Sequence, residues 1–117
     1  MPHGYRQGDI FIEPVLALPA GCAESAPQRR AGELVHVLAE GELTGHAHRV
    51  LAGPGVDLLR DQGGNGTDPL AVGYLRLKRL ARLVHDEHTP VDLPPGNYRV
   101  VQQRRYDPQG PWRRGGD

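Results

Sequence analysis

The sequence predicts an all-β domain, a small antiparallel barrel or sandwich with at most one short helix. Three observations predict it. Short apolar runs recur along the chain, and clusters of Gly, Pro and Asp separate them. The sixteen Gly and eleven Pro residues lie between these runs, as turn residues do. Pro90, Pro94 and Pro95 exclude a long helix after Thr89. Short strands separated by such turns are typical of antiparallel sandwiches and barrels.

Five segments have the composition or alternation of a strand. They are 9–13, 33–38, 46–51, 56–59 and 97–104. The second and third are expected to form a hairpin, because Gly41 and Gly45 bracket a turn between them.

Two further segments are harder to interpret. Residues 70–85 fit either a strand or one face of a helix, and Gly73, with no clear helix cap, favours strands. Residues 19–32 are rich in Ala, Gly, Pro and Ser, so the sequence predicts an exposed, mobile loop there.

The length of 117 residues fits one domain with one hydrophobic core. We expect a single β-rich domain over residues 1–107 and a flexible tail over residues 108–117, where Pro111, Gly115 and Gly116 interrupt any strand pattern. Hydrophobic residues make up 38% of the chain, with one Trp and one Phe, so Leu and Val must supply most of the core.

Charge and cysteine content limit the partners that we expect. Fourteen basic and fourteen acidic residues cancel, which disfavours nucleic acid as a partner and leaves a small molecule, a protein or a second copy of the chain in a homo-oligomer. No apolar run approaches the roughly 18 residues of a membrane span. The single Cys22 cannot form an internal disulfide, so a cytoplasmic location is expected.

Two histidine doublets are the most suggestive chemical feature. His46 and His48 leave the same face of a strand, about 6.5 to 7 Å apart at Cα. His85 and His88 have a spacing that brings two rings together only where the chain turns or coils. Four imidazoles would suit a divalent transition metal such as Zn, Ni, Fe, Mn or Cu, with Glu40, Glu42 or Glu87 as further ligands.

Each histidine also has a simpler interpretation. His46 and His48 could both face solvent, and His85 could stabilise its turn through Asp86 or a backbone carbonyl. His36 lies in an apolar strand and is expected to be a structural histidine. Strand parity sends one glutamine of the last strand, Gln102 or Gln103, inward, where it could hydrogen-bond a histidine ring or the backbone.

Two classes of function follow. The first is a metal-binding β domain, which as an enzyme would be a metal-dependent hydrolase or oxygenase with Glu42 or Glu87 as general base. The second is a non-enzymatic accessory or interaction module, in which the histidines are structural or respond to pH and the chain binds a protein or nucleic acid.

Two motifs carry a resemblance to small uncharacterised bacterial and phage proteins. They are Thr44-Gly45-His46-Ala47-His48 and the pattern from His85 to Tyr98 that contains Glu87, His88, Pro90, Leu93, Pro94 and Gly96. The opening Arg6-Gln7-Gly8-Asp9 belongs to the same resemblance. The His-x-His element is also similar to that of cupins, which are small metal-binding β-barrels, and this similarity implies a barrel with a metal ion. The chain departs from the cupin pattern because it lacks the Glu that follows the second His at short distance.

Overall fold

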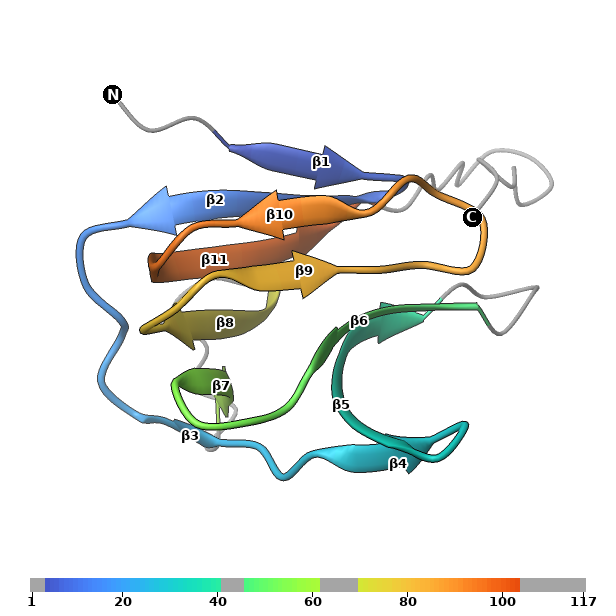
Figure 1. The fold of residues 1–117 in the computed structure, drawn as a ribbon. Helices are drawn as coiled ribbons and strands as arrows, with labels where there is room; N and C mark the ends of the chain where they lie inside the picture. The colour runs from blue at the N-terminus through green and yellow to red at the C-terminus, as the bar shows by residue number, and fades with distance from the viewer. Residues whose placement is uncertain (1–3, 41–45, 62–69, 104–117) are drawn as a thin grey trace, which may run out of the picture.

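The computed structural model describes residues 4–40, 46–61 and 70–103 of the chain. All regular structure in these ranges is β-strand (Figure 1). The strands are β1 (Tyr5–Gln7), β2 (Ile10–Val15), β3 (Cys22–Glu24), β4 (Gln28–Arg30), β5 (Glu33–Glu40), β6 (Ala47–Leu51), β7 (Val56–Asp61), β8 (Ala71–Leu77), β9 (Ala81–Leu83), β10 (Val91–Leu93) and β11 (Gly96–Gln102). The predicted all-β class is therefore confirmed.

One layer is a six-stranded antiparallel sheet in the order β1-β2-β11-β8-β7-β3. It begins with a tight hairpin in which Gln7 pairs with Ile10 across the two-residue loop Gly8-Asp9. Gly8 has a φ of 59°, the positive value that such a loop requires and that glycine adopts without strain. This loop places Gln7 and Asp9 at one end of the sheet.

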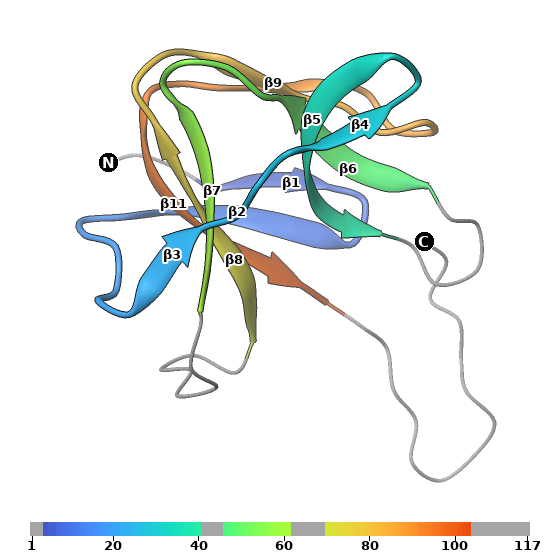
Figure 2. The same ribbon diagram turned by 90° about the horizontal axis from the view of Figure 1, so that it is seen from below.

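The second layer contains the sheet β4-β5-β6 and the hairpin β9-β10. Arg49 of β6 and Val84, which follows β9, exchange two backbone hydrogen bonds of 2.9 Å each. These bonds join β6 to the β9 segment, so the two pieces act as one layer. Figures 1 and 2 show this layer lying against the six-stranded sheet as a sandwich.

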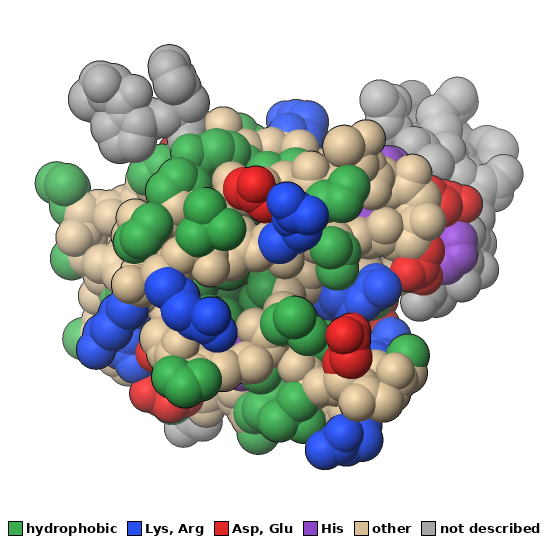
Figure 3. Space-filling model, in the orientation of Figure 1, with side chains coloured by type: hydrophobic (Ala, Val, Ile, Leu, Met, Phe, Trp, Pro, Cys, Tyr) green, Lys and Arg blue, Asp and Glu red, His purple; other side chains and the backbone are tan. Residues whose placement is uncertain are grey.

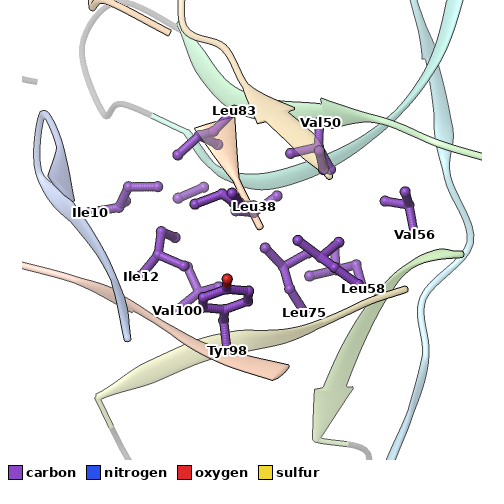
Figure 4. Packing of buried hydrophobic residues seen from close by; sticks show 14 residues of the cluster. Ile10, Ile12, Leu38, Val50, Val56, Leu58, Leu75, Leu83, Tyr98 and Val100 are labelled. Atoms are coloured by element: carbon purple, nitrogen blue, oxygen red, sulfur yellow. The ribbon is translucent and has the colours of Figure 1, made fainter. Parts of the chain in front are cut away.

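The apolar core lies between the two layers. Alternation along each strand supplies it, because every second side chain points inward. Figure 4 shows side chains of both layers pointing toward one another, among them Leu38, Val50, Leu83, Ile12, Leu75 and Val100. All six are essentially inaccessible to solvent. Aliphatic side chains dominate this core, as the composition predicts.

The expected strands agree with the structure better than the expected loop does. Residues 70–85 contain β8 and β9 rather than a helix. The prediction of a mobile loop over residues 19–32 is wrong, since β3 and β4 lie within it. Both are three-residue strands at sheet edges with largely accessible side chains, so no buried apolar face marked them in the sequence.

Some expectations lie outside the described residues, namely the tail over 108–117 and the turn between Gly41 and Gly45. Within the described ranges, no helix has the length and apolar character needed to cross a membrane.

Candidate functional site

Three segments that are distant in sequence meet at one end of the sandwich. They are the β1–β2 turn, the start of β6 and the connection from β9 to β10, and they lie together in both views of the ribbon (Figures 1 and 2). Figure 3 shows histidine and acidic side chains next to one another at this end. We call His46, His48, His85 and His88 the histidine cluster.

The rings of the histidine cluster contact one another. The centroid of the His85 ring lies 4.3 Å from that of His48, 4.4 Å from that of His88 and 5.7 Å from that of His46. The rings of His48 and His88 are nearly parallel, with centroids 6.0 Å apart. The two doublets therefore come together as the sequence predicts, because the chain bends over residues 86–88 directly after His85.

Burial differs between the members of the cluster. His48 on β6 is 1% exposed and His85 is 7% exposed, so both rings are removed from water. The side chain of His46, immediately before β6, is 30% exposed. Its ring lies at the rim, where Nε2 is 3.9 Å from Asp86 Oδ2 and Nδ1 is 3.6 Å from Glu87 Oε1.

The β1–β2 turn makes room for His88. A Cβ atom added to Gly8 would lie 2.4 Å from Nε2 of His88, closer than any van der Waals contact allows. Glycine at this position therefore serves both the positive φ of the turn and the approach of the imidazole.

His48 is held between two side chains of the first hairpin. Its Nδ1 lies 2.8 Å from Oε1 of Gln7, and its Nε2 lies 2.9 Å from Oδ1 of Asp9. Gln102 on β11 donates a 3.0 Å hydrogen bond to the other oxygen of Asp9. Both ring nitrogens of His48 thus face acceptor atoms.

Burial favours the uncharged form of the two inner histidines. Desolvation lowers the pKa of His48, and this effect outweighs the opposing effect of Asp9. Desolvation also lowers the pKa of His85, and repulsion from the neighbouring His88 lowers it further. Neutral imidazole is the form that binds a metal ion.

Two imidazole nitrogens of the cluster are buried without a hydrogen bond. Nε2 of His85 and Nε2 of His88 contact no hydrogen-bond partner within the described ranges. The other nitrogen of His85, Nδ1, accepts a 3.0 Å hydrogen bond from the backbone N–H of Glu87. Buried polar atoms are nearly always paired, so two unpaired nitrogens in touching rings are unusual.

The predicted acidic residues have different environments. Glu87 is exposed and lies next to His46, as a base or further ligand would. Glu40 instead forms an ion pair with Arg30. Glu42 lies outside the described residues. The inner glutamine of β11 is Gln102, whose Nε2 donates hydrogen bonds to Oδ2 of Asp9 and to the Glu40 carbonyl.

Gln7 and Asp9 are site residues that the interpretation of the sequence missed. A signal for them exists, because Gly-Asp between two strand-like segments is a two-residue hairpin loop. That signal locates the turn, but only the folded structure shows that the turn lies against β6. His36, expected to be structural, is 5% exposed, and burial lowers its pKa despite a hydrogen bond to the Val56 backbone.

In this structure the ring nitrogens of the histidine cluster do not converge on one point. No group of three or more His, Cys, Asp or Glu side chains in the described parts of the chain has an arrangement that could hold a metal ion as it stands. Both nitrogens of His48 and one of His85 are already in hydrogen-bond contacts, so ring rotations would have to precede binding by three or more ligands.

Fold and site together define a class, a two-layer antiparallel β domain with a buried histidine cluster at one end. Residues 6–103 match the model of a domain of unknown function, DUF8820, and the chain belongs to that family. No curated protein and no solved structure matches the chain at a significant level. The similarity to cupins stays a prediction.

Proposed function

We propose that this domain binds a divalent transition-metal ion at the histidine cluster. The observation that carries the proposal is the gathering of four imidazoles from two segments, with Nε2 of His88 buried and unpaired against them. An unpaired buried polar atom costs about 1–3 kcal/mol, and coordination to a metal ion would remove that cost. Imidazole is a good ligand for Zn, Cu, Fe and Ni.

Metal titration of untagged protein tests this proposal. Protein stripped with a chelator is titrated with Zn, Ni, Co, Mn and, without oxygen, Fe(II), and bound metal is measured by calorimetry and by elemental analysis. We expect one ion per chain for at least one metal. We also expect a higher melting temperature, because a ligand at 100 times its Kd stabilises the folded state by about 2.7 kcal/mol.

Single substitutions locate the ion. His48→Ala and His88→Ala should each abolish binding, while His36→Ala removes a buried histidine outside the cluster and should leave the stoichiometry unchanged. Circular dichroism of each metal-free variant shows that it is folded. The proposal is wrong if no tested metal binds the wild type, or if His36→Ala loses binding as His48→Ala does.

A catalytic role would add Glu87 to the site. Its carboxylate lies at the rim beside His46, where it could accept a proton from water or substrate. In a metal-dependent hydrolase or oxygenase, Glu87→Gln should lower turnover and keep the metal stoichiometry.

The alternative function is a non-enzymatic interaction module with structural histidines. The contacts of Gln7, Asp9 and the Glu87 amide with the rings favour it, since they hold His48 and His85 in place without a metal ion. This alternative predicts that no metal raises the melting temperature, so the same titration separates the two functions.

A further inference from the structure

The amide of Gln7 has one allowed orientation. Its Nε2 donates two hydrogen bonds of 3.0 Å, one to the carbonyl of Leu83 and one to the carbonyl of Thr89. A reversed amide would place Oε1 against those two carbonyl oxygens, which only accept hydrogen bonds. Gln7 is also 3% exposed, so water cannot replace these partners.

This orientation assigns the two ring nitrogens of His48. Oε1 of Gln7 lies 2.8 Å from Nδ1 of His48, and an amide oxygen only accepts a hydrogen bond. Nδ1 of His48 must therefore carry a hydrogen. In the neutral ring the lone pair is then on Nε2, which is the atom that faces Asp9.

Asp9 is held with one oxygen toward Nε2 of His48. Its Oδ2 accepts the hydrogen bond from Gln102, and its backbone carbonyl accepts a 2.8 Å hydrogen bond from the N–H of Gln103. Its Oδ1 lies 2.9 Å from Nε2 of His48. At this distance an ion that replaces the hydrogen between the two atoms could be bound by both.

We infer that Asp9 is a metal ligand together with Nε2 of His48, and that Gln7 is the positioning residue that directs this nitrogen to the ion. The inference rests on the proposed function and adds a carboxylate to the ligand set. His88 is the third ligand, because its unpaired Nε2 lies against Gly8, next to Asp9. Its ring must rotate to complete the set.

His85 has a different role in this arrangement. Its Nδ1 accepts the N–H of Glu87, so the hydrogen of the neutral ring is on Nε2, and that nitrogen has no lone pair for a metal ion. His85 packs between the other rings as a spacer. Two imidazoles and one carboxylate leave positions open on the ion, so the set fits an open site for Fe(II), Mn, Co or Zn rather than a closed four-ligand site.

Asp9→Asn and Gln7→Leu test the inference, with Asp92→Asn and Gln28→Leu as controls on exposed strands. Affinity for Mn and Co is measured by calorimetry, and the melting temperature of the chelated protein reports on folding. We expect Gln7→Leu to weaken binding by about 10- to 100-fold, as loss of a ligand's orienting partner does elsewhere. Asp9→Asn removes a ligand itself and should weaken binding at least as much. The two controls should bind as the wild type does.

A spectroscopic readout separates positioning by Gln7 from a merely structural role. In the Zn-loaded wild type, nitrogen NMR of the His48 ring should show a protonated Nδ1 and a metal-bound Nε2. In Gln7→Leu, this single pattern should be lost even where the variant melts normally.

The outcomes distinguish the two proposals. Wild-type binding with an unchanged affinity in Asp9→Asn would overturn the role of Asp9 and leave the histidine site standing. Metal bound at Nδ1 of His48 would overturn the role of Gln7. Absence of binding by the wild type would overturn both proposals.

Discussion

The apolar core and the two inner histidines of the cluster, His48 and His85, are buried to a similar degree, but they differ in how their polar atoms find partners. Leu75 and Leu83 in the core are 0% exposed, and His48 in the cluster is 1% exposed. Core side chains need only shape and contact, which strand alternation supplies. The cluster contains ring nitrogens that need partners, and two of them have none among the described residues.

This difference shows that burying ring nitrogens at the histidine cluster costs the fold free energy that the apolar core does not. Aliphatic side chains at the four positions of the histidine cluster would avoid burying polar atoms at the end of the sandwich. The chain instead keeps four imidazoles there and holds one of them with Gln7 and Asp9. A local departure from the rules that build the rest of a domain is typical of a functional site.

Truncation of a core residue is the strongest test of whether core and cluster are separable. Leu75→Ala removes a fully buried side chain from the centre of the six-stranded sheet, and we expect it to lower the free energy of unfolding by about 2–5 kcal/mol. Denaturant unfolding measures this loss. Metal stoichiometry of the folded fraction should stay as in the wild type, and its loss in folded protein would show that the two regions depend on one another.

A smaller effect is expected from Gly8→Ala, with Gly32→Ala as its control. Both glycines have a positive φ, 59° and 82°, so alanine costs roughly 1–2 kcal/mol in backbone strain at either position. Only at Gly8 does the new Cβ meet the His88 ring, since it has open space at Gly32. We expect Gly8→Ala to unfold at lower denaturant than Gly32→Ala and to weaken metal binding.

Equal unfolding midpoints for these two variants would contradict the close approach of His88 to the turn. Weaker metal binding in Gly32→Ala would likewise show that the effect is general to turns rather than specific to the site.

The parts that sequence reasoning predicted are those with a local periodic signal. Alternation located β2, β5 and β11, and strand parity with the bend after His85 brought the two doublets together. The edge strands β3 and β4 have no buried apolar face, so their composition resembled a loop. Gln7 and Asp9 meet His48 across about forty residues of sequence, through a pairing of layers that no local pattern encodes.

The smallest expected effect is the loss of stability on acidification. It should come from the buried histidines and not from the apolar core, because aliphatic side chains do not titrate. Burial lowers the pKa of His36, His48 and His85 in the folded state. The unfolded chain therefore binds more protons than the folded chain below the ordinary histidine pKa of about 6.5, and stability falls as the pH drops through that value. Each unit by which folding lowers a histidine pKa corresponds to about 1.4 kcal/mol of unfolding free energy that is lost at low pH.

Melting temperatures between pH 8 and pH 5, in chelator so that no metal contributes, measure this dependence. His36→Gln isolates one histidine outside the cluster, where the nearby Asp57 and Glu24 oppose the effect of burial and Arg60 adds to it. That variant should lose stability less steeply on acidification than the wild type does. A melting temperature that rises toward pH 5 would mean that the buried rings gain protons on folding, and the cluster would then be a charged network rather than a set of neutral ligands.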